Sequence, residues 1–182
     1  MTVITYKWTV DRYHQAVEAG IFNAQPLELL NGELIEMSPE GISHAALSSD
    51  AGDYFRELLG LRAKIREGKP ITLPNNSEPE PDIAVLDPDS AIYRLHHPYP
   101  ENIFWIIEYS NSSLQKDLDI KSKVYAAANI SEYWVINLKK MELVVFRDPV
   151  AQEYRSQATF TDGVVRPLAF QDTAVSVSRL LT

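Results

Sequence analysis

The sequence contains no cysteine among its 182 residues. This absence excludes disulfide bonds, thiolate metal sites and cysteine nucleophiles. The chain also lacks an apolar run that approaches the roughly 20 residues needed to cross a bilayer, so we expect no membrane-spanning helix. Its opening residues, MTVITYKWTVDRYH, lack a basic segment followed by an apolar one. We therefore expect no signal peptide and a cytoplasmic protein.

Positive charge is also scarce, because 17 Lys and Arg residues stand against 25 Asp and Glu residues, giving a net charge of -8. This balance argues against a general nucleic-acid binder, although it allows a nucleic-acid enzyme with a local basic face. The stretch LRAKIRE predicts such a face, because Arg62, Lys64 and Arg66 would share one side of a strand. An ordinary solvated strand face is the alternative interpretation.

The residues that are present indicate a globular protein with a single domain over residues 1–182, since 45% of them are hydrophobic. Thr9 is expected to cap a short helix that runs to Gly20, with Val10, Tyr13 and Val17 on one side. In LELLNGELIEM, Asn31-Gly32 between two apolar segments predicts a hairpin. A two-residue turn would pair Leu30 with Glu33 and Glu28 with Ile35, placing both glutamates on one face.

The rest of the chain alternates predicted helices and strands. We expect a second helix from His44 to Leu59, capped by Ser43 and ended by Gly60, and a third from Gln115 to Ala128, ended by Asn129. Strands are expected at LRAKIRE, DIAVL, IFWIIEY, EYWVIN and MELVVF, and VSVSRLLT should pack on the body. This order predicts an α/β fold in which a mixed β-sheet is flanked by helices, with an N-terminal helix and hairpin.

Two carboxylates lie at the ends of predicted buried strands. Asp82 begins one strand and Glu108 ends the next. If the two strands are antiparallel neighbours, both carboxylates meet at one edge of the sheet. Such a pair repels unless a proton or a cation lies between the two groups, and hard oxygen ligands suit Mg²⁺ or Mn²⁺. The alternative is two unrelated acids, one capping and one solvated.

Lys121 is predicted to lie on the buried face of the third helix, because it shares a stripe with Leu118 and Tyr125 at spacings of three and four. A buried ammonium group needs a carboxylate partner, which either Asp117 or Glu108 could supply. Such a lysine would orient or activate an attacking water and add positive charge near a transferred phosphate. The alternative is a lysine that extends to solvent at the edge of the helix.

The segment EYSNSSLQKDLDIKSKVYAAANISEYWVIN resembles the core of the Uma-type family of putative restriction endonucleases, a bacterial family common in cyanobacteria. The shared features are a strand that ends in Glu108, a Ser-rich turn, a D-x-x-x-K motif from Asp117 to Lys121, Tyr125, and a strand beginning EYW. Pro81-Asp82 matches the "PD" of the wider PD-(D/E)XK nuclease superfamily. The hairpin segment followed by His44 also matches, so the resemblance extends from about Leu27 to Phe146.

The resemblance implies a restriction-endonuclease-like core with Asp82 and Glu108 as metal ligands and Lys121 as the catalytic lysine. Glu33 or Glu28 would supply a further acid, and His44 would line the site. Each of these three has a purely structural alternative, and Asp117 could act only by holding Lys121. The superfamily lysine two residues after the glutamate is replaced by Ser110, which implies that Lys121 has taken over its role. Asn129 stands where the family usually has glycine.

Three functions remain open from the sequence. The first is a Mg²⁺-dependent DNA endonuclease, with Mn²⁺ as a substitute metal, that hydrolyses phosphodiester bonds through a metal-activated water and acts as a homodimer. The second is a non-catalytic interaction module that retains the nuclease fold, which the acidic net charge favours. The third is a metal-free hydrolase that uses two carboxylates on sugars, although an inward lysine between them is not expected there.

Overall fold

The computed structural model describes residues 5–23, 25–89 and 91–182. Its elements, in chain order, are α1 (Val10–Glu18), β1 (Leu27–Leu30), β2 (Glu33–Glu36), α2 (Ile42–Leu59), η1 (Gly60–Arg62), β3 (Lys64–Glu67), β4 (Ile83–Leu86), η2 (Ile92–Arg94), η3 (Pro100–Asn102), β5 (Ile103–Ser110), the π-helical turn η4 (Lys116–Lys121), α3 (Ser122–Ala127), β6 (Glu132–Asn137), β7 (Glu142–Val150), β8 (Glu153–Phe160), β9 (Val164–Val165), β10 (Val175–Ser176) and α4 (Ser178–Leu181). None of the helices among these residues is long and apolar enough to cross a membrane.

The main sheet has six strands in the order β3-β4-β5-β6-β7-β8. Neighbouring strands are antiparallel except for β5 and β6, which are parallel. A parallel pair needs a crossover connection, and here η4 and α3 supply it. The predicted α/β fold, with a mixed sheet flanked by helices, is therefore confirmed.

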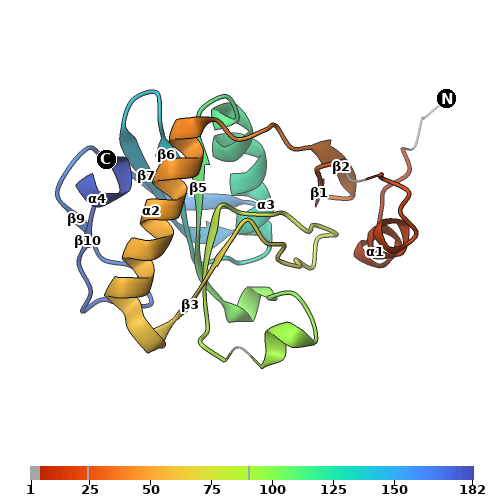
Figure 1. Ribbon diagram of the computed structural model, residues 1–182, viewed down its shortest axis with the longest axis horizontal. Helices are drawn as coiled ribbons and strands as arrows, with labels where there is room; N and C mark the ends of the chain where they lie inside the picture. Colours follow the sequence, from red (N-terminus) through yellow and green to blue (C-terminus); the bar gives the residue numbers. More distant parts are fainter. Residues whose placement is uncertain (1–4, 24, 90) are drawn as a thin grey trace.

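Each face of the sheet packs against its own set of helices because successive strand residues point to opposite sides. One face packs against α2 and α4, and its members include Phe55, Val85, Trp105, Trp134 and Leu180. The other face packs against α3 and the N-terminal hairpin, and its members include Leu30, Ile106, Tyr125, Tyr133 and Val144. Figure 1 shows α2 crossing the sheet, with α1 and the hairpin at the end of the molecule opposite α4.

The N-terminal hairpin forms with the predicted register, since Leu30 pairs with Glu33 and Glu28 with Ile35. The two turn residues, Asn31 and Gly32, both have positive φ, 49° and 77°, which a type I′ turn requires. Gly32 also has no room for a side chain, because an added Cβ would lie 2.9 Å from the carbonyl oxygen of Trp8. The segment before α1 thus closes over the turn.

Two local predictions need correction. Helix α2 begins at Ile42 after Gly41, so Ser43 lies inside the helix and does not cap it. In α1, Tyr13 of the predicted stripe is buried, but Val17 is 51% exposed and Ala16 is buried in its place. The predicted cap residues Thr9 and Asn129 are confirmed: Thr9 accepts a hydrogen bond from Arg12 N, and Asn129 has φ of 59°.

The predicted basic strand is also only partly correct. Arg62 lies in η1, before β3, and its guanidinium binds Asp172 at 2.9 Å and Thr173 at 2.7 Å. Lys64 and Arg66 remain on the strand, and Lys64 is exposed while Arg66 is half-buried. The chain therefore has no three-residue basic face at this strand.

Candidate active site

The pairing of β4 with β5 brings Asp82 and Glu108 together. The strands are antiparallel, and Ile83 pairs with Ile107, so Asp82 lies opposite Glu108 at the next position of the register. The backbone N–H of Tyr109 donates a 2.6 Å hydrogen bond to Asp82 Oδ2, which holds the carboxylate against the end of β5. The predicted meeting of these two acids at one edge of the sheet is confirmed.

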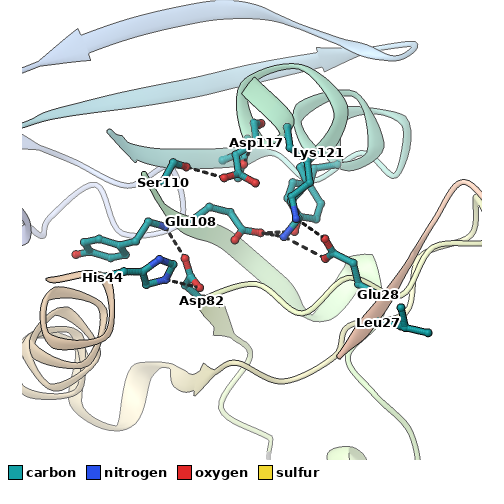
Figure 2. Close-up of polar contacts among 12 residues, drawn as sticks. Leu27, Glu28, His44, Asp82, Glu108, Ser110, Asp117 and Lys121 are labelled. Carbon is teal, nitrogen blue, oxygen red and sulfur yellow. Dashed lines mark hydrogen bonds and ion pairs between the residues drawn. The ribbon is translucent and has the colours of Figure 1, made fainter. Parts of the chain in front are cut away.

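Lys121 is directed at the same point from the crossover helix. Its side chain is 5% exposed, and its Nζ lies 2.8 Å from Glu108 Oε1 and 3.2 Å from Glu28 Oε2. The hydroxyl of Tyr125, one turn later, donates a 2.8 Å hydrogen bond to the same Glu108 oxygen. Figure 2 shows Glu108 between Asp82 on one side and Lys121 with Glu28 on the other.

The two hairpin glutamates occupy different environments. Glu28 is completely buried and also binds Lys116, whose Nζ lies 2.8 Å from its Oε1. Glu33 is exposed and pairs with Lys7, outside the cavity that holds Glu28. Although the register puts both on one hairpin face, only Glu28 lies under the crossover helix. Glu33 is therefore removed from the set of candidate residues.

His44 and Asp117 complete the predicted set. His44 Nε2, in the first turn of α2, lies 3.0 Å from Asp82 Oδ1. Asp117 is buried, but of the two carboxylates considered as partners of Lys121 it is Glu108 that forms the ion pair. Asp117 accepts a 2.7 Å hydrogen bond from the hydroxyl of Ser110, which links the end of β5 to the following helix. A single cavity of about 810 Å³ is lined by Glu28, His44, Asp82, Glu108, Asp117 and Lys121.

Burial and charge in this cavity shift several pKa values. Burial, with Asp82 and Asp117 close by, raises the pKa of Glu108 to about 8 despite the adjacent lysine. Burial alone would lower the pKa of Lys121, but Glu108, Glu28 and Asp117 raise it. The hydrogen bond to Asp82 raises the pKa of His44. The cavity thus gathers more negative charge than its cations offset, which favours a bound proton or metal ion.

The residues present fit a hard divalent cation. Glu108 Oε1 accepts from Lys121 and Tyr125, whereas no described residue donates a hydrogen bond to Oε2. Asp82 Oδ2 accepts one hydrogen bond, from the Tyr109 N–H, which leaves lone pairs of this carboxylate free. Ligand atoms of Glu40, His44 and Asp82 also lie within 4.8 Å of one another. Asp82 is therefore a member of this group and also lies opposite Glu108. Carboxylate oxygens beside an open cavity are the donors that Mg²⁺ and Mn²⁺ prefer.

Several contacts were not found from the sequence. The sequence placed Tyr125 on the buried stripe of the helix but did not indicate its hydrogen bond to Glu108. Lys116 carried no signal, because its partner Glu28 lies 88 residues earlier. The π-helical turn η4, which ends at Lys121, was also missed, and such turns occur frequently at functional sites. The D-x-x-x-K spacing predicts that Asp117 and Lys121 lie on one face of a helix, but it carries no sign that this turn is π-helical.

Comparisons with known proteins give a family for the chain and a similar fold among solved structures. A family model described as "Uma2: Putative restriction endonuclease" matches residues 10–178. Among solved structures, the chain is similar to a protein from Anabaena variabilis ATCC 29413 described as a putative nuclease belonging to DUF820. The TM-score is 0.66 at 18% identity, and the match covers 85% of this chain and 89% of the other. No protein among those with curated functions matches.

Proposed function

Because the chain belongs to the Uma2 family, described as putative restriction endonucleases, we propose that it is a Mg²⁺-dependent DNA endonuclease that hydrolyses phosphodiester bonds. The observation that carries the proposal is the meeting of Asp82 and Glu108 at one cavity with Lys121 bonded to Glu108. These three side chains come from two strands and a helix that pack around a single point. A purely structural ion pair would need no second acid and no open cavity.

Asp82 and Glu108 would hold the metal ion, with Mn²⁺ able to replace Mg²⁺. The bound ion would supply a water of lowered pKa and positive charge that stabilises the phosphorane-like transition state. Glu108 is suited to this role because its Oε2 accepts no hydrogen bond from the described residues, while Oε1 is fixed by Lys121 and Tyr125. Asp82 is fixed in turn by the Tyr109 N–H and by His44.

Lys121 would act on the attacking water and on the transferred phosphate. The carboxylates around it keep its ammonium group charged, so it can stabilise a developing negative charge but not remove a proton. Glu28 and Lys116 would be positioning residues, since Glu28 holds Lys121 at 3.2 Å and Lys116 holds Glu28 at 2.8 Å. Cleavage of both DNA strands would require two such sites, for which we propose a homodimer.

The non-catalytic interaction module is a second candidate, and one observation favours it. Lys121 is bound by two carboxylates in the same cavity, so its charge is already neutralised in the metal-free chain. A fold that had lost catalysis could keep such a closed cluster for stability alone. The net charge of -8 is likewise unhelpful for DNA binding. The two candidates differ in whether a divalent ion enters the cavity.

Metal binding is therefore the first test. Calorimetric titration with Mn²⁺ should give one binding event in the wild type that is at least about tenfold weaker in Asp82→Asn and in Glu108→Gln. Asp119→Asn, an exposed acid on the same crossover helix, is the matched control and should bind as the wild type does. Magnesium-dependent cleavage of plasmid DNA should follow the same pattern.

The outcomes separate the candidates. Absence of Mn²⁺ binding in the wild type, even with DNA present, would reject the nuclease and leave the interaction module. Binding that survives in both Asp82→Asn and Glu108→Gln would mean that the ion occupies another part of the chain. Sedimentation of the metal-loaded protein with and without a DNA duplex would test the proposed homodimer.

A further inference from the structure

A second group of potential metal ligands lies away from the candidate active site. His14 of α1, Glu78 of the connector between β3 and β4, and His97 of the loop before β5 have ligand atoms within 4.8 Å of one another. His14 Nε2 lies 2.7 Å from Glu78 Oε1 and 2.8 Å from Oε2. The rings of His14 and His97 meet edge to face, with centroids 6.1 Å apart.

The three segments are held in place by contacts that do not involve these side chains. Next to His14, the hydroxyl of Tyr13 donates a 2.8 Å hydrogen bond to the carbonyl of Leu27. The backbone of Glu78 pairs with Leu29 through hydrogen bonds of 2.7 and 3.4 Å. The carbonyl of Pro98, next to His97, accepts a 2.9 Å hydrogen bond from Thr72 N. The cluster is therefore built into the fold before any ligand binds.

The side chains also suit a metal ion chemically. Glu78 is only 3% exposed, and its Oε2 is oriented by a 2.7 Å hydrogen bond from the hydroxyl of Thr72. Outer contacts of this kind fix the direction of a ligating carboxylate. Burial, together with Arg66, lowers the pKa of His97 despite the nearby Glu78, which favours the neutral ring that a metal requires. Both histidines are partly exposed, so an ion can reach them from solvent.

We propose that His14, Glu78 and His97 form a second metal site that binds Zn²⁺. Two imidazoles and one carboxylate are ligands that Zn²⁺ takes, with a water in the fourth tetrahedral position, whereas Mg²⁺ prefers oxygen donors alone. Ligand atoms about 2.0–2.1 Å from the ion stand roughly 3.4 Å apart in a tetrahedron. The present spacings bracket this value, from 2.7 Å between His14 and Glu78 up to the 4.8 Å limit of the group.

Such an ion would join α1 to the body of the protein. It would cross-link the N-terminal helix, the connector and the loop before β5, which are distant in sequence. Glu78 pairs with Leu29, the neighbour of Glu28, so the ion would also stabilise the strand that carries Glu28 to Lys121. The proposed site thus shares no ligand with the candidate active site, but strand β1 connects the two.

The test is a Zn²⁺ titration of the metal-stripped full chain by calorimetry, with thermal unfolding measured in parallel. The wild type should bind Zn²⁺ at this site and melt at a higher temperature with Zn²⁺ present. His97→Gln should weaken this binding by about 100-fold and abolish the Tm shift, and His14→Gln should do the same. Thr72→Val, which removes only the outer contact to Glu78, should weaken binding about 10–100-fold.

The adjacent histidine provides a matched control. His96 stacks on Tyr99, with ring centroids 4.2 Å apart, and is outside the ligand group. His96→Gln should therefore bind Zn²⁺ as the wild type does. Both His96 and His97 are in a loop, so the two substitutions carry similar risks for folding.

A second pair of variants separates this site from the candidate active site. His44→Gln and Asp82→Asn should keep the binding event that His97→Gln loses. If instead Zn²⁺ binding disappears in Asp82→Asn and persists in His97→Gln, the ion occupies the active-site cavity and the second site is rejected. Absence of any Zn²⁺ binding in the wild type also rejects it. Neither result bears on the Mn²⁺ titration of Asp82 and Glu108, so the two proposals fail separately.

Discussion

Two buried glutamates on adjacent strands of the same sheet, Glu132 of β6 and Glu108 of β5, have very different environments. Glu132 Oε1 accepts from Trp134 Nε1 at 2.9 Å and from Arg147 at 2.6 and 2.9 Å, and its Oε2 accepts from Leu168 N at 2.7 Å. Both of its oxygens are therefore satisfied. Glu108 has two donors on one oxygen, and it lines a cavity with other carboxylates.

The comparison separates a glutamate that only supports the fold from one that is suited to bind a metal ion. Burial is common to both, so burial alone does not mark a functional residue. The difference is that Arg147 neutralises Glu132, and both oxygens of Glu132 accept hydrogen bonds. Glu108 instead has one oxygen, Oε2, that accepts no hydrogen bond from the described residues. Burial raises its pKa to about 8, and the cavity beside it has space for an ion. Removal of each side chain should accordingly affect different properties.

The largest expected effect is on the stability of Glu132→Gln. Arg147 would lose its carboxylate partner while most of its side chain stays covered, and breaking a buried ion pair from one side lowers the free energy of unfolding by about 3–5 kcal/mol. Denaturant unfolding would measure this loss, provided that the dependence of the unfolding free energy on denaturant concentration is the same in variant and wild type. Glu101→Gln, at an exposed position, should change stability by less than about 0.5 kcal/mol. Glu132→Gln should also bind Mn²⁺ as the wild type does. A loss of Mn²⁺ affinity would contradict the view that Glu132 only supports the fold.

The next effect is on catalysis in Lys121→Met. Removal of the one ammonium group bonded to Glu108 should lower the rate of Mg²⁺-dependent DNA cleavage by about 10²–10³-fold, since it stabilises charge in the transition state. Mn²⁺ should still bind, because both carboxylates remain. Lys123→Met is the matched control, since Lys123 is exposed and pairs only with Asp119 among the described residues. Equal loss in both variants would contradict the assignment.

A smaller effect concerns how stability depends on pH. The pKa of Glu108 is raised from its ordinary 4.5 to about 8, so between these values the folded chain holds a proton that the unfolded chain has released. Wild-type stability therefore falls as pH rises through this window. Glu108→Gln lacks this term, so without metal its stability relative to that of the wild type should rise by at least about 1 kcal/mol between pH 5 and pH 8. A constant difference across pH 5–8 would contradict the expectation.

The sequence predicted those parts of the site that follow from local periodicity and strand pairing. Asp82 and Glu108 were placed together because they stand at opposite ends of two antiparallel strands. Lys121 was placed inward because a helix repeats every three to four residues. The hairpin register followed from a two-residue turn whose residues adopt positive φ. Each of these rules acts over short distances or between neighbouring strands.

The parts that were missed depend on packing between distant segments. The hairpin could place Glu28 and Glu33 on one face, but only the docking of the hairpin under η4 decides that Glu28 meets Lys121. The spacing left Asp117 and Glu108 both open as partners of Lys121, and only the fold shows that Asp117 binds the Ser110 hydroxyl at the end of β5 instead. The helix cap was misjudged because Gly41 can adopt the extended conformation that Ser43 was expected to take. None of these outcomes has a marker in the local sequence.

The smallest expected effect distinguishes the two hydroxyls that reach the site from neighbouring tyrosines. Tyr125 and Tyr133 are both fully buried, and their rings meet edge to face at 4.9 Å. The Tyr125 hydroxyl donates to Glu108 Oε1 at 2.8 Å, whereas that of Tyr133 donates to the carbonyl of Asp117 at 3.1 Å. Each Tyr→Phe substitution removes one buried hydrogen bond, so each should lower stability by about 0.5–1.5 kcal/mol.

Metal affinity should separate the two substitutions that stability cannot. Tyr125→Phe frees the Glu108 carboxylate to rotate, and loss of such an outer contact weakens metal binding about 10–100-fold. Tyr133→Phe leaves Glu108 untouched and should bind Mn²⁺ as the wild type does. Calorimetry on both variants under one condition would measure the difference. Equal affinities would mean that Lys121 alone orients Glu108, so that Tyr125 belongs with Glu132 among the residues that only support the fold.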